Sequence, residues 1–404
     1  MRLRIKDICD YVSRGTTPDY VDEGANKVMN QATFSKGWID ESNIRYTSKA
    51  NKGARIMKGD LLMASTGGGV LGKVFFFDDD DSFYADSHVT IMRNSKGANL
   101  MKYLYYYFYL RYDEINATMV KGSTNQTELQ RNYLLSYELD VPTLADQQRM
   151  VTYLDTKLSE IDHQVSLLTS KRDAYLRLKK SIINHAVTRG LNPNVKMKDS
   201  GIEWIGEVPE HWEVKRMKDI FFERKELSLT GEEDLLSVSE FYGVARRKDK
   251  MNSDEEFESR ADSLVGYKIC KAHDLVINIM LAWKTGLGIS DNDGIVSPAY
   301  AVYEGRNIAS HFYHYLLRSG MYVKEFKRHS KGIIDSRLRL YNDRFNNISA
   351  IYPPLPEQRA IATYLDDKCA KIDIIVSNLD KQISRYADLK RSLIDEVITG
   401  KRAV

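Results

Sequence analysis

The chain repeats part of itself, and this internal duplication constrains its fold more than any other feature of the sequence. The segment that starts at Val141 aligns without a gap with the segment that starts at Tyr352, an offset of 352 − 141 = 211 residues. Between residues 142–190 and their counterparts, 19 positions are identical. Self-similarity at a fixed offset is typical of chains that use one structural unit more than once. We therefore expect two equivalent structural units.

The repeated segment is predicted to form a long helix. In both copies, apolar residues recur at alternating steps of four and three, which is the seam of a coiled coil. Gly190 and Gly400 stand where left-handed caps would end the two helices, and Pro356 suits the first turn of the second helix. At 1.5 Å rise per residue, about 43 residues would span roughly 65 Å. The predicted seam residues are Leu154, Leu158, Ile161, Val165, Leu168, Tyr175 and Ile182 in the first copy, and Leu365, Cys369, Ile372, Val376, Leu379, Ile383, Tyr386 and Leu393 in the second.

The two seams have two alternative partners. Each seam could pack on its own neighbouring domain, or the two seams could pack on each other. One chain carries two equivalent seams that are joined through an intervening domain. We therefore favour an antiparallel pair of helices over separate docking.

The segments before the two helices repeat only faintly. Lys6-Asp7-Ile8 opens one segment and Lys218-Asp219-Ile220 opens the other. Each segment then has an Asp before an apolar strand and a Gly-bearing loop, as in KGDLLMASTGG from Lys58 and AHDLVINIMLAWKTG from Ala272. An aromatic helix follows, YLYYYFYLR ending at Arg111 and FYHYLLRSG starting at Phe312. Short β-branched and aromatic runs between Gly, Asn and Asp turns indicate a mixed α+β domain in each segment.

The predicted fold class is therefore α+β, with pseudo-two-fold symmetry. Two mixed α/β domains are separated by an antiparallel coiled coil of two long helices. The polar, Pro-containing stretch after Gly190 is typical of a linker. The predicted boundaries are 1–142 for the first domain, 143–190 for the central helix, 191–353 for the linker and second domain, and 354–404 for the C-terminal helix.

Charge and cysteine content limit the function classes. The formal net charge is +3, from 59 basic and 56 acidic residues, so a nucleic-acid site would have to be a local basic surface. Cys9, Cys270 and Cys369 are far apart and form no CxxC pair, which argues against a zinc site or a disulfide framework and favours a reducing cytoplasm. The N-terminal residues lack the apolar region of a signal peptide, and no uncharged apolar run of about 18 residues predicts a membrane span.

Several motifs suggest chemistry but fail on inspection. Residues Gly67–Lys73 resemble a phosphate-binding loop, but Val74 replaces the required Ser or Thr, so a Gly-rich hairpin turn is predicted. Asp78–Asp81 is read as a solvated turn between strands, because adjacent strand residues point to opposite faces and cannot converge on a metal. His311 and His314 lie three apart but have no evident third ligand, so no metal site is predicted.

Enzymatic motifs for acting on DNA are also lacking. The aromatic run Tyr103–Tyr109 could stack on flipped bases, but on a helix it is expected to be core. An adenine methyltransferase needs an Asn/Asp-Pro-Pro-aromatic motif, and neither NPNV at Asn192 nor YPPL at Tyr352 fits it. No catalytic residue is therefore predicted in this chain.

The run SGIEWIGEVPEHWEVKRMKDI from Ser200 resembles the opening of a target-recognition domain in the specificity subunits of type I restriction-modification systems. LADQQRMVTYLDTKLSEID from Leu144 and LPEQRAIATYLDDKCAKID from Leu355 resemble the two conserved helical regions of that family. These three motifs are specific as an ordered set, and the resemblance covers essentially the whole chain. The first domain lacks the EWIGE-type opening and starts at Met1 with RLRIKDI, which leaves its N-terminal boundary open.

The resemblance implies a non-catalytic DNA-binding subunit of a larger complex. Each target-recognition domain would read one half of a split, asymmetric DNA site, and the helix pair would hold the domains apart. Two modification subunits would bind the chain and methylate adenine with S-adenosylmethionine, and ATP- and magnesium-dependent restriction subunits would cleave unmodified DNA. This chain itself would hold no cofactor. The alternatives are a coiled-coil scaffold that reads no bases and an enzyme that acts alone.

The candidate DNA contacts are basic, amide, hydroxyl and aromatic residues in Gly-bearing loops. Lys and Arg would contact phosphates or guanine, and Asn and Gln would suit adenine. For any single candidate, an ordinary solvated loop residue is the favoured alternative. The basic run KRDAYLRLKK from Lys171 could cross the DNA backbone, but it also fits a solvated helix face or a partner contact. The candidates are Arg14, Thr16, Thr17, Lys73, Lys121, Ser123, Thr124, Asn125 and Gln126 in the first domain, and Arg246, Arg247, Lys248, Trp283, Lys284, Lys331 and Arg337 in the second.

Overall fold

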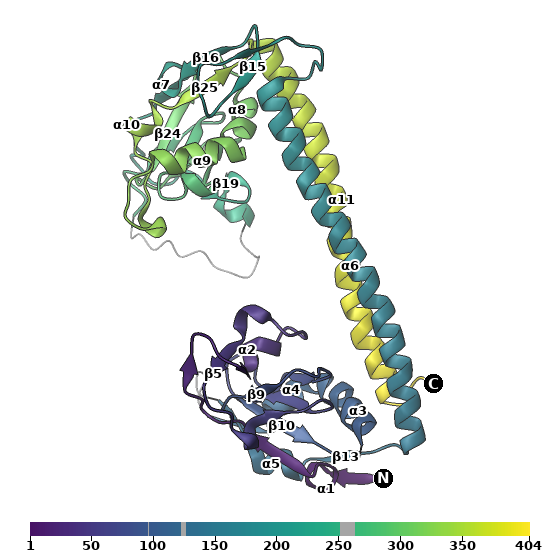
Figure 1. Ribbon diagram of the computed structural model, residues 1–404. Coiled ribbons are helices and arrows are strands. Elements are labelled where there is room, and N and C mark those ends of the chain that lie inside the picture. Colours follow the sequence, from purple (N-terminus) through teal and green to yellow (C-terminus); the bar gives the residue numbers. More distant parts are fainter. Residues whose placement is uncertain (96, 123–126, 251–262) are drawn as a thin grey trace. The chain divides into compact units, whose positions relative to one another are not determined.

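The computed structural model describes residues 1–95, 97–122, 127–250 and 263–404, and its contacts divide the chain into two compact units (Figure 1). The first unit contains residues 1–169 and 381–404, and the second contains residues 170–380. Each unit combines one mixed α+β domain with one end of each long helix. The predicted α+β class with two long helices is confirmed.

The first domain contains a four-stranded antiparallel sheet in the order β2-β10-β7-β8 and a five-stranded sheet in the order β3-β5-β4-β9-β6. Two short ladders, β1-β13 and β11-β12, accompany them. Its strands are β1 (Arg2–Arg4), β2 (Tyr11–Arg14), β3 (Tyr20–Val21), β4 (Asn26–Met29), β5 (Arg45–Thr47), β6 (Arg55–Ile56), β7 (Leu61–Ala64), β8 (Val74–Phe76), β9 (Phe83–Ala85), β10 (Val89–Arg93), β11 (Val120–Lys121), β12 (Glu128–Leu129) and β13 (Glu138–Asp140). Its helices are α1 (Ile5–Ile8), α2 (Gln31–Phe34), η1 (Glu41–Asn43), η2 (Lys52–Ala54), α3 (Ala98–Tyr109), α4 (Tyr112–Thr118) and α5 (Arg131–Ser136).

Strand β7 explains why an unbroken apolar run forms a strand here. Successive side chains of a strand point to opposite faces of the sheet. Leu61 and Met63 join the core that contains α3, whereas Leu62 and Ala64 join the core beneath the five-stranded sheet. Because both faces of β7 are buried, the strand is apolar at every position, not only at alternate ones.

The second domain has the same central sheet, in the order β17-β24-β21-β22, which matches β2-β10-β7-β8 strand for strand. The pairs β14-β15, β16-β25, β18-β19 and β20-β23 surround it. Its strands are β14 (Met197–Asp199), β15 (Glu207–Pro209), β16 (Glu213–Arg216), β17 (Phe221–Glu223), β18 (Leu236–Ser239), β19 (Gly243–Arg246), β20 (Lys268–Cys270), β21 (Leu275–Asn278), β22 (Leu287–Ile289), β23 (Gly294–Val296), β24 (Tyr300–Gly305) and β25 (Ser349–Tyr352). Its helices are α7 (Met217–Ile220), η3 (Arg247–Lys250), η4 (Ala282–Lys284), α8 (Ser310–Leu317), α9 (Gly320–His329), η5 (Asp335–Arg337) and α10 (Asn342–Phe345).

The faint repeat before each long helix is also confirmed. Helices α1 and α7 both follow an Arg, and in each the third helical residue is an Asp. Asp7 accepts a hydrogen bond from the Arg4 backbone N–H (3.2 Å), and Asp219 accepts one from that of Arg216 (3.0 Å). A carboxylate in the first turn satisfies an N–H that the helix leaves free and complements the helix dipole.

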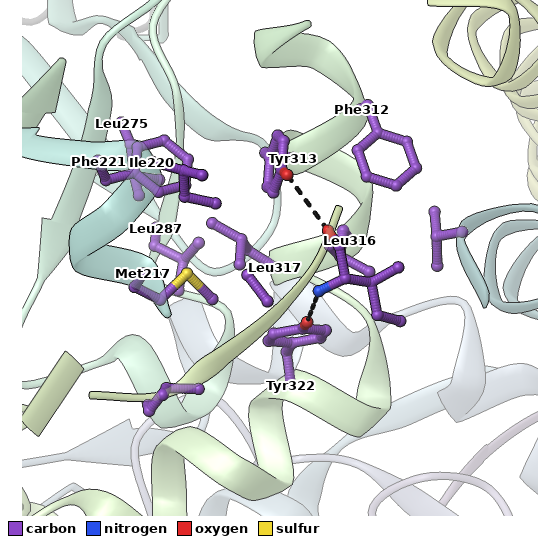
Figure 2. Packing of buried hydrophobic residues seen from close by; sticks show 14 of the residues in the cluster. Met217, Ile220, Phe221, Leu275, Leu287, Phe312, Tyr313, Leu316, Leu317 and Tyr322 are labelled. Carbon is purple, nitrogen blue, oxygen red and sulfur yellow. Dashed lines mark hydrogen bonds between the residues drawn. The ribbon is translucent and has the colours of Figure 1, made fainter. Parts of the chain in front are cut away.

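The core of the second domain is aromatic and extends onto the long helices. Figure 2 shows Tyr313 and Tyr322 reaching the backbone of β25 from α8 and α9. The Tyr313 hydroxyl donates to the carbonyl of Ile351 (3.2 Å), and the Tyr322 hydroxyl accepts from the N–H of the same residue (3.1 Å). These bonds satisfy buried polar groups that would otherwise be costly. The same core includes Val187 and Leu365 from the long helices.

The two long helices are α6 (Leu144–Arg189, 46 residues) and α11 (Leu355–Ile398, 44 residues). Gly190 and Gly400 follow them with φ of +75°, as predicted for left-handed caps. Pro356 lies in the first turn of α11, also as predicted.

The helices pack against each other antiparallel within each unit. In the second unit, Arg172 contacts Asp380 (3.5 Å) and Lys179 contacts Asp373 (2.6 Å), so the partner number falls as the residue number rises. In the first unit, Asp162 contacts Lys390 (2.7 Å). The favoured antiparallel arrangement is therefore present.

All fifteen predicted seam residues are buried or half-buried. The alternative, packing on the neighbouring domain, also holds at the helix ends. Leu154, Leu158 and Ile161 share one core with α3, and the same core contains Leu393 of α11. Each domain is therefore closed by both helices at once.

A matching polar contact joins each domain to its helix. The Tyr106 hydroxyl of α3 donates to Asp155 of α6 (2.6 Å), and the Tyr315 hydroxyl of α8 donates to Asp366 of α11 (2.8 Å). The two aspartates lie 366 − 155 = 211 residues apart, which is the offset of the repeat. Burial is the main cause that raises the pKa of both tyrosines well above the ordinary value, and the hydrogen bond to Asp is the next. Each hydroxyl therefore remains a donor.

The Gly-rich motif of the first domain is a turn, as predicted, and the acidic motif is an exposed loop between two strands. Residues 67–73 connect β7 to β8, and Asp78–Asp81 lies between β8 and β9. The aromatic run is α3, where Tyr103, Tyr106 and Phe108 are buried.

Candidate nucleic-acid interface

In the first domain, two predicted contact segments meet at one end of the four-stranded sheet. Arg14, at the end of β2, donates from Nε to the carbonyl of Ser87 (3.0 Å) and forms an ion pair with Glu128 (3.4 Å). Glu128 forms a β-bridge with Thr66 in the Gly-bearing loop and pairs across its ladder with Lys121, which is exposed. The sheet end thus brings Arg14 close to the β11–β12 ladder and Lys121.

The segment after Arg14 runs close to a neighbouring backbone. Thr16 forms a parallel bridge with Asp86, and Thr17 is exposed. A Cβ on Gly15 would lie 2.1 Å from the carbonyl oxygen of Ala85, so a larger residue would push the segment away. Four predicted contacts, Ser123, Thr124, Asn125 and Gln126, lie outside the described residues.

Lys73 lies in a different place from Arg14. Its Nζ donates to the carbonyl of Ser35 (3.2 Å), and it lines a cavity of about 290 Å³ together with Lys36, Tyr105 and Tyr109. Among the described residues, Arg14, Glu128 and Thr66 do not line this cavity. Lys73 is therefore not part of that cluster.

In the second domain, the predicted basic run begins at the last residue of β19 and continues into η3. Arg246 and Lys248 both form ion pairs with Asp234, at 3.2 Å and 2.6 Å. Arg247 is exposed at the start of η3. The Asp234 carboxylate thus forms ion pairs with two of the three basic residues, next to the start of β18.

Trp283 and Lys284 lie beside the loop that carries Lys331 and Arg337. The Nζ atoms of Lys284 and Lys327 lie 4.9 Å and 5.0 Å from the Trp283 ring centroid, in cation–π contact. Lys327 also pairs with Asp335 of that loop (2.9 Å). The loop carrying the two predicted contacts, both of them exposed, is closed by backbone bonds between Lys331 and Arg339. Lys327 was missed, although the basic last turn of a helix is a visible signal.

Arg318 was also missed by sequence reasoning. Its guanidinium donates to the carbonyls of Thr285 (2.7 Å) and Leu287 (2.6 Å) on one turn, and to those of Glu240 (3.0 Å) and Phe241 (3.1 Å) on another. Burial lowers its pKa from the ordinary value. Arg318 therefore fixes the Trp283 loop to the tip of the β18–β19 hairpin, where the Phe241 side chain is 90% exposed.

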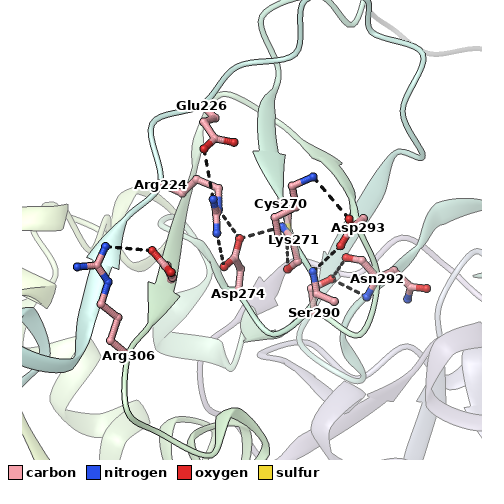
Figure 3. Close-up of polar contacts among 11 residues, drawn as sticks. Arg224, Glu226, Cys270, Lys271, Asp274, Ser290, Asn292, Asp293 and Arg306 are labelled. Atoms are coloured by element: carbon pink, nitrogen blue, oxygen red, sulfur yellow. Dashed lines mark hydrogen bonds and ion pairs between the residues drawn. The ribbon is translucent and has the colours of Figure 1, made fainter.

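A buried ion pair anchors the central sheet of each domain, at the end where β7 and β21 begin. Asp60 and Asp274 directly precede β7 and β21, and they pair with Arg93 (2.6 Å) and Arg224 (2.7 Å). Burial raises the pKa of Asp60, and the bond to Arg93 opposes that shift. Figure 3 shows two nitrogens of Arg224, Nε and Nη2, reaching the Asp274 carboxylate. Arg93 ends β10, whereas Arg224 follows β17, which is not the equivalent strand. Both domains therefore have the ion pair, but the arginine comes from a different strand in each.

The histidines of α8 have protein partners. His311 lies 3.2 Å from Asp291 and 3.6 Å from Asp366. His314 Nδ1 accepts from the Ile289 N–H (3.3 Å), and burial lowers its pKa to about 3. Across the described ranges, no three His, Cys, Asp or Glu side chains are grouped so as to hold a metal ion. No helix in those ranges combines the length and apolar character needed to cross a membrane.

The geometry defines a class of protein: two related α+β domains, each with basic side chains in its loops, on a pair of antiparallel helices. A family model of the type I restriction modification DNA specificity domain matches residues 1–167 and 209–385. The chain therefore belongs to the family of type I restriction-modification specificity subunits, whose role is DNA sequence recognition.

Two known proteins illustrate the similarity. The chain is 21% identical over 329 residues to the specificity subunit of the type I restriction enzyme MjaVIII from Methanocaldococcus jannaschii, covering 77% of this chain and 73% of that protein. A solved chain from a study of complex assembly and conformational transition in a type I R-M system matches with a TM-score of 0.69 at 13% identity, covering 98% of this chain and 97% of the other. At this identity, the second match establishes the fold alone.

Proposed function

We propose that this chain reads a split DNA site in the cytoplasm, with one half-site for each domain. In this proposal the α6–α11 pair sets the spacing between half-sites and docks two modification subunits. The modification subunits supply S-adenosylmethionine-dependent adenine methylation, and restriction subunits joined to them supply ATP- and magnesium-dependent cleavage. The chain itself contributes recognition and no catalysis.

One observation carries the proposal. The equivalent contacts Tyr106–Asp155 and Tyr315–Asp366 attach each domain to a helix at positions one repeat apart. Two recognition modules attached alike would each meet DNA in the same way, as the two halves of a dimer do in palindrome-binding proteins.

The candidate contact surfaces of the two domains differ, although their central sheets have the same strand order. The first domain offers Arg14, Thr17 and Lys121, whereas the second offers Trp283, Lys327 and the exposed Phe241. Two unlike half-sites would require different side chains on equivalent sheets, because base readout depends on the donors, acceptors and methyl groups that each base pair presents.

Exposed apolar residues on the helices support docking of two identical partners. Leu178 is 47% exposed, and its repeat counterpart Leu389 is 48% exposed. Ile374 is 62% exposed. Isolated apolar residues on a surface are common, but a repeated pair on equivalent helices fits two equal contacts.

The test is reconstitution with the modification subunits of the same system, followed by mapping of methylated adenines. The proposal predicts a two-part consensus with a fixed spacer. Methylation without a split consensus would contradict it. A chain that recruits the modification subunits but confers no sequence preference would favour the scaffold alternative.

A further inference from the structure

The first unit contains a polar cavity of about 320 Å³ beside the Arg14 cluster. Its walls include Tyr20, Gln31, Arg45 and His88. Thr66 connects the cavity to Arg14. Its hydroxyl forms a hydrogen bond with His88 Nδ1 (2.6 Å), and its backbone forms a β-bridge with Glu128, which pairs with Arg14. The cavity therefore belongs to the same end of the sheet as the predicted DNA contacts.

Gln31 is the side chain in this cavity with unused hydrogen-bonding capacity. Among the described residues, its Oε1 is buried and receives no hydrogen bond. A buried acceptor without a donor is costly. Turning the amide outward to meet a ligand would break no hydrogen bond to that oxygen. Its Nε2 lies against Gly67, 3.4 Å from the position a Cβ would take there.

The neighbouring groups hold Gln31 in place but are themselves occupied. Asn30 caps helix α2, where its Oδ1 accepts from the backbone N–H of Ala32 (2.8 Å) and of Thr33 (3.1 Å). This cap fixes Gln31 as the first helical residue. Asp86 accepts from the His88 N–H (2.8 Å) and from the Tyr20 hydroxyl (3.3 Å).

A cation completes one wall of the cavity. The Arg45 guanidinium lies over the Tyr20 ring, 5.1 Å from its centroid, and forms no ion pair with any carboxylate in the described parts of the chain. An exposed guanidinium held by an aromatic ring is well suited to a phosphate oxygen.

We propose that this cavity reads one adenine of the half-site assigned to the first domain, with the Gln31 amide on the adenine N6 and N7 and Arg45 on a nearby phosphate. The inference rests on the proposed function. Gln31 needs a donor for Oε1 and an acceptor for Nε2, and in the major groove adenine presents this pair. Guanine presents two acceptors, which the buried Asp86 carboxylate in the same wall would disfavour.

The experiment uses the complex with its modification subunits and three single variants of this chain: Gln31→Ala, Gln31→Glu and, as a control, Asn132→Ala. Asn132 is an exposed amide on α5 outside the cavity. Binding is measured on duplexes that carry each of the four base pairs at every position of the first half-site. A further duplex carries 7-deazaadenine, which lacks N7, at the assigned adenine.

Gln31→Ala should remove about tenfold or more of the preference at one A·T position, with the other positions and the second half-site unchanged. Gln31→Glu should shift that position towards cytosine, since a carboxylate can accept from cytosine N4 but cannot donate to N7. The 7-deazaadenine duplex should weaken binding of wild type and Asn132→Ala several-fold and leave Gln31→Ala unaffected.

Three results would overturn the inference: unchanged preference at every position, a change confined to the second half-site, or loss of preference at a G·C pair. Failure of the proposed function is distinguishable, because the wild-type complex would then show no split consensus at all.

Discussion

Lys179 and Asp373 form an ion pair at 2.6 Å, and the residues one repeat away from them, Lys390 and Asp162, form the same ion pair at 2.7 Å. The residue numbers of the two pairs have the same sum, since 179 + 373 = 552 and 162 + 390 = 552. The antiparallel helices therefore have one register in both units. A duplicated helix that pairs with its own copy satisfies each contact twice, which explains why the repeat is clearest here.

Reversing one charge in this pair should weaken the helix pair modestly. Lys179→Glu places two carboxylates together, and the double variant Lys179→Glu/Asp373→Lys should restore most of the loss. Because both side chains are partly exposed, the interaction energy should be below about 1 kcal/mol. A double-mutant cycle from urea unfolding measures it. Independent, additive effects of the two changes would contradict the contact.

Truncation at the helix ends should be far more damaging than truncation on the outer face. Leu154 is fully buried among α3, α6 and α11, so Leu154→Ala should cost about 2–5 kcal/mol. Leu178→Ala, at an exposed position, should change the free energy of unfolding by less than about 0.5 kcal/mol. Equilibrium denaturation of both variants tests this, and equal losses would contradict the assigned packing.

The exposed residues should instead matter for assembly. Leu178→Asp combined with Leu389→Asp should weaken binding of the modification subunits by at least tenfold while the fold remains intact. Titration calorimetry or analytical ultracentrifugation of the purified subunits measures the affinity, and Leu176→Asp, another partly exposed apolar position of α6, is the matched control. Normal affinity in the double variant would place the docking surface elsewhere.

Each tyrosine junction should stabilise its own unit. Tyr106→Phe removes the hydrogen bond to Asp155 and should cost about 1 kcal/mol. Hydrogen exchange should become faster in α3 and in the N-terminal turns of α6, and Tyr315→Phe should do the same for α8 and the start of α11. Faster exchange in the opposite unit from the one changed would argue against independent junctions.

Acid should destabilise the second domain through His314. Burial lowers the pKa of His314 to about 3, below the ordinary value of 6.5. Between these values the unfolded chain binds a proton that the folded chain does not, so stability falls as pH drops below 6.5, by up to about 1.4 kcal/mol per pH unit. His314→Gln keeps an acceptor for the Ile289 N–H and should flatten this slope. Urea unfolding at pH 7 and pH 5 compares the two proteins, and equal slopes would exclude His314 as the cause.

The sequence predicted the parts of the fold that depend on local periodicity. The seams, the caps at Gly190 and Gly400 and the antiparallel pairing follow from residues a few positions apart and from the duplication itself. The order of elements in each domain was also predictable, because the Asp before β7 and β21 marks the same place in both copies.

The candidate contact surfaces could not be predicted in the same way, because they depend on residues far apart in the chain. In the sequence, Arg318 looks like an ordinary arginine at the end of a helix. Its contacts with two turns depend on folding, because those turns lie more than 30 and more than 70 residues earlier in the chain. Gln31 gains its role from Gly67 and the cavity around it. Lys73 looked equivalent to Arg14 in sequence, yet its side chain lines another cavity.

The most direct measurement is methylation mapping of a complex in which residues 1–142 are replaced by the first domain of another specificity subunit. If each domain reads its own half-site on helices of fixed register, one half of the consensus should change, while the other half and the spacer length stay the same. A consensus in which both halves change together, or neither does, would contradict the account.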